Sequence, residues 1–354
     1  MAQEDAVKNT NLGDRDIAKE LDIDDRVPLT VPRESFVTAK DHKDTFENRP
    51  QARLLNPCKP ELGRVSKQLL EEIVAEVKKK TGLLQFKNTF AALKWFNSIE
   101  NKKKCNFIQF DIVEFYPSIS ENLLTDALQW AEQFTEITDQ TKKIIKQVRK
   151  SFLYYKGRAY VKKNGDDWDV SMGSYDSAEC ADLVGLYILS KLKHLPVQCG
   201  IYKDDGISIS DLTPQQTENV KKEICQIFKD HGLKIKIECN KKVVNYLDVT
   251  FDLIKGEHRP FRKENNTPLY VNAKSNHPPS VKKTLPINVN KRLNALSSNE
   301  LAFKNAAPLY QDALNKAGYK HELKYEKVDL IQFNKKKRSR PRHNRIYWFN
   351  PPYD

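Results

Sequence analysis

The chain has 354 residues, too many for one small core, and we expect two or three lobes. Its 60 Lys and Arg residues outnumber 47 Asp and Glu residues, and the net charge of +13 favours a polyanionic partner, nucleic acid or an acidic membrane surface, over a merely soluble basic protein. No apolar run is long enough for a membrane span, and the six cysteines form no CxxC pair, which excludes a zinc knuckle. The polar N-terminus does not resemble a signal peptide, so we expect an intracellular protein, in the nucleus, the cytoplasm or both.

The first hundred residues combine a polar start with two strand-like runs and a helix. Residues 1–30 are charged and lack a clear period, so we expect a flexible tail with one short helix. Runs near 36–37 and 53–55 predict an exposed hairpin. This hairpin carries the cations Lys40, Lys43 and Arg53. Residues 66–80 have a helical apolar period and end in three lysines, which predicts an amphipathic helix.

From residue 107 onward, strand-like and helix-like segments follow one another. We expect strands at 107–110, 233–239 and 245–253, and a strand–turn–strand at 199–210. A hairpin at 157–172 is expected to turn at Asn164-Gly165. The expected helices are 121–134, 141–155, 177–193 and 213–231. Ser120 precedes the first of these helices as an N-cap residue. This order predicts an α+β fold with an antiparallel sheet of the split βαβ type, backed by helices.

Three carboxylates are expected to meet at one end of this sheet. Asp111 follows the strand 107–110, and Asp204 and Asp205 lie in the turn of 199–210. If each motif is considered alone, the simpler interpretation is a strand-end cap for Asp111 and a solvated turn for the Asp-Asp pair. If the strands are neighbours, the acids converge and need cations to neutralise them. Hard oxygen ligands suit Mg²⁺, and two such ions suit a phosphoryl transfer.

Several segments resemble reverse transcriptases. "FDIVEFYPSI" (110–119) and "YKDD" (202–205) resemble the two catalytic motifs of the palm, and "MGSYDSAE" (172–179) stands between them, where those enzymes carry a Gly-Ser turn. "KSNHPPS" (274–280) is similar to a segment of Penelope-like retroelement enzymes, and the resemblance covers roughly residues 33–350. In this sequence Met172 replaces a common Gln, and Lys203 fills the variable position of YxDD.

The resemblance implies a right-hand polymerase with fingers, palm and thumb. Its implied domains are a charged flexible tail (1–30), fingers and connecting helices (31–105), a palm (106–255) with a helical fingers insert at about 121–155, a primer-grip-following segment and thumb (256–333), and a basic aromatic tail (334–354).

The resemblance also implies residue roles. Asp111 and Asp204 bind two Mg²⁺ ions, for which Mn²⁺ substitutes, with Asp205 as a third carboxylate and Ile112 contributing its backbone. Tyr116 lies beneath the sugar, where a ring clashes with a 2′-hydroxyl; an ordinary core aromatic is the alternative. The implied dNTP contacts are Lys40, Lys43, Arg53, Tyr116 and Gly173, and the implied nucleic-acid contacts are Ser174, Tyr202, Lys335, Lys336, Lys337 and Arg338. For the cations the alternative is a solvated face, and for Gly173 it is a plain turn.

The expected function is that of a retroelement reverse transcriptase, which extends a DNA primer with dNTPs on an RNA template. The alternatives are an RNA-dependent RNA polymerase, which Tyr116 argues against, and a decayed polymerase-fold protein that only binds nucleic acid. No endonuclease signature is visible, so we expect DNA nicking to be supplied by a missing domain or by another protein, and the chain to be a fragment or a truncated copy. The sequence does not give the oligomeric state.

Overall fold

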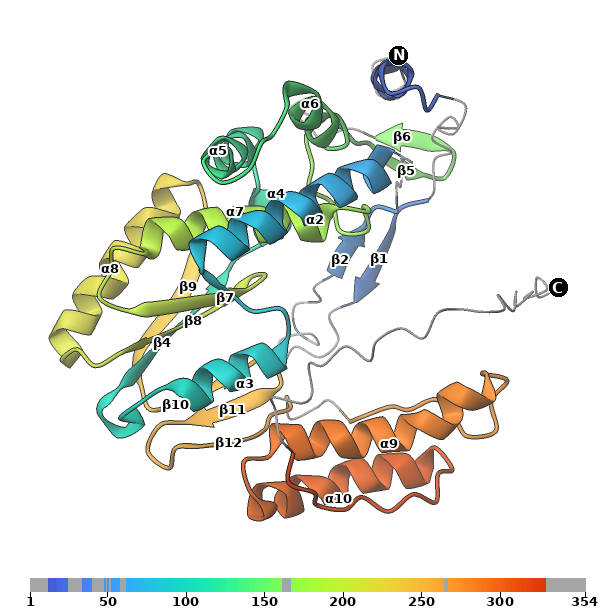
Figure 1. The fold of residues 1–354 in the computed structure, drawn as a ribbon. Coiled ribbons are helices and arrows are strands. Elements are labelled where there is room, and N and C mark those ends of the chain that lie inside the picture. Colours follow the sequence, from blue (N-terminus) through green and yellow to red (C-terminus); the bar gives the residue numbers. More distant parts are fainter. Residues whose placement is uncertain are drawn as a thin grey trace. The chain divides into compact units, whose positions relative to one another are not determined.

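The computed structural model describes residues 12–24, 34–39, 48, 50, 52–57, 62–160, 167–263 and 267–328. The chain divides into two compact units, Met1–Thr267 and Pro268–Asp354, which are described separately (Figure 1). No helix among the described residues is both long and apolar enough to cross a membrane.

A five-stranded sheet is the centre of the first unit. Its strands are, in spatial order, β3 (Leu84–Gln85), β7 (Gln198–Tyr202), β8 (Asp205–Ser210), β4 (Asn106–Ile112) and β9 (Ile235–Lys241). All neighbouring pairs are antiparallel except β3 and β7. The sheet therefore has the mixed α+β character expected from the order of segments, and its two longest strands, β4 and β9, lie side by side.

Helices bury one face of this sheet. They are α2 (Leu62–Thr81), α5 (Glu121–Ala131), α7 (Ser177–Leu192) and α8 (Pro214–Asp230). Figure 1 shows α2 and α7 lying side by side across the sheet, and their buried side chains join those of Ile108, Phe110 and Ile112 in one core. Because side chains alternate along a strand, Phe107, Gln109 and Asp111 of β4 point to the opposite face.

A smaller sheet lies near that opposite face. It consists of β10 (Val243–Tyr246), β11 (Val249–Asp252) and β12 (Glu257–Pro260), all antiparallel, with α3 (Thr89–Ser98) packed against it. Phe96 of α3 stacks on Phe251 with ring centroids 4.5 Å apart, and both rings contact Phe107. Apolar contacts thus join the second sheet to β4.

The remaining described elements of this unit are short. They are a helix over residues 12–20, β1 (Phe36–Ala39), β2 (Ala52–Leu55), a 3-10 turn (Lys102–Lys104), α4 (Phe115–Ser118), α6 (Asp139–Gln147), β5 (Leu153–Tyr155) and β6 (Arg158–Tyr160). β1 and β2 pair antiparallel, as the sequence predicts for this hairpin. The Oγ of Ser120 accepts a hydrogen bond from Leu123 N at 3.2 Å, which confirms the predicted cap of α5.

Two local predictions are wrong. The helix predicted for 141–155 ends at Gln147, and Leu153–Tyr155 form strand β5 instead. That strand pairs with β6 around Lys156 and Gly157, whose positive φ angles of 49° and 75° make the turn. The predicted turn at Asn164-Gly165 lies outside the described residues. The segment 245–253, predicted as one strand, is split into β10 and β11 by Leu247, whose φ of 56° reverses the chain.

The second unit contains two helices and an extended segment. α9 (Pro279–Leu296) and α10 (Glu300–Lys316) are joined by a short turn in which Asn299 caps α10, and Leu293, Leu296, Phe303 and Leu314 are buried. Residues 319–328 are held along α9 by side-chain amides. Asn290 accepts from Lys324 N at 2.9 Å, and Asn294 accepts from Glu326 N at 2.7 Å.

Candidate active site

The two acidic motifs meet at the end of β4 and β8. β7 and β8 form a hairpin in which Tyr202 pairs with Asp205 around Lys203 and Asp204. On the other side of β8, Asp111 is the register partner of Asp205. Ile112 N donates to the carbonyl of Asp204 at 2.9 Å, which fixes the turn against the end of β4. Directly opposed residues have Cα atoms about 5 Å apart, so Asp111 and Asp205 are neighbours across the sheet, and Asp204 adjoins them in the turn.

These carboxylates repel one another. Burial, followed by the negative charges of Asp204 and Asp111, raises the pKa of Asp205 to about 6, and the nearby Lys263 opposes this shift. As the side chains stand, no group of three or more His, Cys, Asp or Glu side chains in the described ranges is gathered closely enough to hold a metal ion. Asp111, Asp204 and Asp205 nevertheless offer the carboxylate oxygens that a hard divalent cation prefers as ligands. Neighbouring carboxylates raise one another's pKa, and a bound cation would compensate their negative charges.

Two residues hold the base of the hairpin in place. Tyr246, from β10, is 1% exposed, and its hydroxyl donates to the carbonyl of Asp205 at 3.0 Å. Gly206 follows Asp205, and a Cβ at this position would lie 2.0 Å from the ring of Phe110. Only glycine lets β8 pack on that ring. Tyr246 could not be identified from the sequence, because a long-range hydrogen bond to a backbone carbonyl leaves no local pattern.

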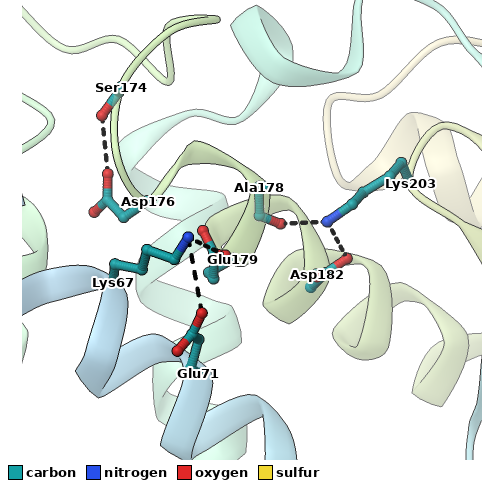
Figure 2. A network of polar contacts seen from close by, with 8 residues as sticks. All are labelled: Lys67, Glu71, Ser174, Asp176, Ala178, Glu179, Asp182 and Lys203. Carbon is teal, nitrogen blue, oxygen red and sulfur yellow. Dashed lines mark hydrogen bonds and ion pairs between the residues drawn. The ribbon is translucent and has the colours of Figure 1, made fainter. Parts of the chain in front are cut away.

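Lys203 is bound to α7 through its side chain. Its backbone has a φ of 54°, a left-handed conformation suited to the turn. Its ammonium group bonds to Asp182 at 2.7 Å and donates to the carbonyl of Ala178 at 2.9 Å, both on α7 (Figure 2). The cation at the variable position of YxDD therefore neutralises an acid of α7 and connects this helix to the turn that carries Asp204.

Tyr116 lies near the same turn. It is half-buried on α4 against the main core. Burial, followed by the charges of Asp182, Asp204 and Glu179, raises the pKa of the phenol to about 12. The hydroxyl is therefore neutral at physiological pH, and the ring lies within the field of Asp204. The packing fits both interpretations of this residue, core aromatic and site residue.

The loop between the two acidic motifs packs on β2. Gly173 has a φ of 113°, and a Cβ there would lie 2.7 Å from the carbonyl oxygen of Asn56. Asn56 N in turn donates to the carbonyl of Met172 at 3.0 Å. Gly173 thus has a structural role in the chain itself: it permits close contact between this loop and the backbone that follows Leu55.

A buried ion pair fixes the other end of this loop. Arg149 and Asp176 are both fully buried and form a salt bridge. Asp176 also accepts hydrogen bonds from Ser174 at 2.9 Å (Figure 2) and from Ser66 of α2. Ser174 is therefore bound to the start of α7. The sequence does not reveal this pair, because its members are 27 residues apart and meet only in the folded chain.

The other predicted site residues have separate locations. Tyr202 is half-buried at the end of β7, and Arg53 is exposed on β2. Lys40, Lys43 and the segment Lys335, Lys336, Lys337 and Arg338 lie outside the described residues.

Comparisons with known proteins give one family match and several structural likenesses. Residues 269–325 match the model of the animal helix-turn-helix domain. No curated protein matches the chain.

The similar solved structures are polymerases. The RNA-dependent RNA polymerase of a human picobirnavirus is 11% identical with a TM-score of 0.49, and the match covers 76% of this chain and 58% of that one. Apo telomerase from Candida tropicalis is 13% identical with a TM-score of 0.44, covering 56% and 45%. Telomerase from Candida albicans is 10% identical with a TM-score of 0.47, covering 73% and 46%. The matches thus span about half the length of these proteins.

Proposed function

We propose that the protein is an RNA-directed DNA polymerase of a retroelement, which extends a primer 3′-hydroxyl with dNTPs on an RNA template. The observation that carries this proposal is the register of β4 and β8, which opposes Asp111 to Asp205 and sets Asp204 in the adjoining turn. Sequence motifs that resemble the reverse transcriptase palm supply exactly these acids. In this proposal the first unit holds fingers and palm, and the second unit is the thumb.

The proposed cofactor is Mg²⁺, with Mn²⁺ as a substitute. Asp111 and Asp204 would hold two ions, with Asp205 as a third ligand and the backbone of Ile112 beside them. When bound, the ions supply charge neutralisation of the attacking and leaving oxygens in phosphoryl transfer. The raised pKa of Asp205 supports this assignment, because a cation is what this cluster of acids needs.

The chain's own residues would position the reactants. Tyr116, neutral beside Asp204, presents a ring that restricts the space for a sugar and favours deoxynucleotides. Gly173 and Ser174 form a fixed loop toward template or nucleotide, and Arg53 offers a planar fork for phosphate oxygens, with Lys40 and Lys43 as further contacts. Tyr202 leads into the acidic turn. Because the ammonium of Lys203 is bound on α7, it does not compete with the metal ions for Asp204.

The proposed partners are an RNA template, a DNA primer and dNTPs. The proposal also includes the Penelope-like assignment, a nucleic-acid contact by the basic segment Lys335–Arg338, and a location in the nucleus or cytoplasm. It further includes an endonuclease supplied from elsewhere. The net charge of +13 and the helix-turn-helix match of residues 269–325 support a nucleic-acid partner.

A primer-extension assay tests the function. The purified chain is given a DNA primer on an RNA template with Mg²⁺, and separately dNTPs or NTPs. We expect extension with dNTPs, none with NTPs, and none by Asp204→Asn. Asp211→Asn, which changes an acid just after the opposite end of β8, is the matched control and should extend normally. Extension with NTPs alone would identify an RNA polymerase. Binding without extension in Mg²⁺ or Mn²⁺ would identify a decayed, binding-only protein.

A further inference from the structure

The second unit contains a cavity that has no role in the proposed chemistry. Its volume is about 500 Å³, and one wall is a face of α9. Valine and leucine side chains of that helix form the floor. The polar and aromatic groups of the lining are Tyr270, Thr284, Asn288, Arg292 and Tyr310. Two aromatic rings, an amide and a guanidinium thus surround an apolar hollow.

The spacing of residues along α9 explains this arrangement. Val281, Leu285, Asn288, Arg292 and Leu296 follow one another at intervals of three and four, so they share one face of the helix. Arg292 lies within that face, and its long side chain places a cation on an otherwise apolar wall. The cavity is therefore lined by one stripe of α9 together with two tyrosines, Tyr270 and Tyr310.

The helix that lines the cavity is strongly basic. α9 carries Lys282, Lys283, Lys291 and Arg292 and no acidic residue. α10 carries two cations and two acids, and they form the pairs Lys304–Glu300 and Lys316–Asp312, each at 2.8 Å. Over 268–328 there are ten Lys and Arg residues and four Asp and Glu residues. The excess charge is thus concentrated on the helix that forms the cavity, which favours a polyanionic ligand over an apolar or acid-poor peptide.

We propose that this cavity binds an unpaired base of single-stranded nucleic acid. A base is flat and has two apolar faces, so it fits a hollow with tyrosine rings, while the amide of Asn288 can hydrogen-bond to its edge. Arg292 and its neighbour Lys291 are placed to meet the phosphates that flank the base. A base within a duplex is stacked and paired on both sides and is not available to such a hollow, so the site distinguishes single strands from duplexes. This site lies outside the unit that carries Asp111 and Asp204, and it goes beyond the proposed polymerase activity.

The test compares the affinity of the full-length protein for single strands and for duplexes. Fluorescence anisotropy is measured with a labelled twelve-nucleotide RNA, the same sequence as DNA, and each as a duplex. We expect Tyr270→Leu/Tyr310→Leu to weaken single-strand binding by about tenfold or more, the scale of one lost stacking contact, and duplex binding by less than about twofold. The RNA and DNA arms show which strand the cavity prefers.

Matched controls separate stacking from folding and from general charge. Tyr325 packs on Phe303 outside the cavity, at 5.7 Å between ring centroids, so Tyr325→Leu should leave single-strand affinity unchanged. Arg292→Gln should weaken single-strand binding and lower its salt slope by about one. Lys283 lies two residues from both Val281 and Leu285, on another side of α9, so Lys283→Gln should leave the preference for single strands intact. Thermal melting confirms that each variant is folded.

Two results would overturn the proposal. Single-strand binding by the double tyrosine variant at the wild-type level would show that the cavity takes no base. An equal loss for single strands and duplexes would show that the unit binds through charge alone. Asp204→Asn should bind single strands normally. If the wild-type protein never extends a primer, but the double tyrosine variant loses single-strand binding, the proposed polymerase activity is refuted and the proposed base-binding site is retained.

Discussion

The first unit contains two clusters of charge near α7 that differ in how the charge is compensated. Asp176 is fully buried, and the chain supplies Arg149, Ser66 and Ser174 as partners. At the end of β8, Asp205 lies beside two further acids whose charges raise its pKa. A carboxylate whose charge is compensated by other residues of the chain stabilises the fold. Carboxylates that face one another require a cation from outside, and this difference separates structural acids from candidate functional ones.

The largest expected effect is on activity at the second cluster. Asp204→Asn should lower primer extension by at least about 10³-fold, the scale on which loss of one catalytic group acts in other enzymes. The same change removes one of three mutually repelling charges, so the melting temperature should stay the same or rise. Extension and thermal melting of the same preparation check both parts. A melting temperature well below that of the wild type would mean that Asp204 belongs to the structural class.

The next effect is on stability at the first cluster. Asp176→Asn leaves the guanidinium of Arg149 buried without its counter-charge, and we expect a loss of about 3–5 kcal/mol in the free energy of unfolding. Urea unfolding monitored by circular dichroism measures this loss. In Arg149→Met/Asp176→Leu both charges are gone, so the double variant should recover much of the stability. A double variant as unstable as the single one would refute the compensation argument.

A third acid, Asp14, separates the effect of burial from that of charge repulsion. Asp14 is 4% exposed, and burial raises its pKa from 3.8 to about 6, while a hydrogen bond from Gln147 opposes the shift. Because the folded-state pKa is the higher one, the stabilising contribution of the protonated form is complete below pH 3.8. It is lost as the pH rises through about 6.

The stability of the wild type should therefore fall by up to about 3 kcal/mol between pH 4 and pH 7 from this group alone. In Asp14→Asn that part of the pH dependence should be absent. Urea unfolding at pH 4.5 and pH 7.5 on both proteins gives the difference. Identical pH profiles would contradict the shift.

The positions of most strands along the chain could be predicted from the sequence, and so could the meeting of the acids on the condition that the two strands are neighbours. The alternation in 107–112 fixes which side of β4 faces the helices, and Asp111 and the Asp204-Asp205 pair each end an apolar run, so adjacency of the two strands was enough to bring them together. The residues around 153–155 were predicted wrongly, since Leu153 and the two tyrosines continue a helical apolar period that their pairing with β6 overrides.

The contacts that position the acids could not be predicted. Arg149 and Asp176, or Tyr246 and the carbonyl of Asp205, meet only after the helices and sheets have packed. Lys203 shows the limit most clearly. Its place between Tyr202 and Asp204 left the direction of its side chain open, and the structure shows a left-handed backbone with the side chain bound to α7. A side chain's direction at a hairpin turn depends on one φ angle, which single-sequence patterns do not determine.

The smallest expected effect comes from this lysine, and it links the two clusters. α7 begins beside Asp176 and carries Asp182, the partner of Lys203 at 2.7 Å, so the same helix is bound at the loop of Ser174 and at the turn of Asp204 (Figure 2). Lys203→Met should release the turn from α7 and lower the rate constant for extension by about fivefold. The KM for dNTP should change less, and so should the melting temperature, because the pair is partly exposed and its coupling is about 1 kcal/mol.

A double-mutant cycle separates this positioning role from a direct one. If the pair acts as a unit, Asp182→Asn should give the same loss, and Lys203→Met/Asp182→Asn should lose no more than either single variant. Lys203→Arg keeps the charge and should retain most of the activity. Lys221→Met, which breaks an exposed pair with Glu218 on α8, is the matched control and should extend normally. Additive losses in the double variant would show that Lys203 acts on the acids of the hairpin by another route, and the two clusters would then be independent.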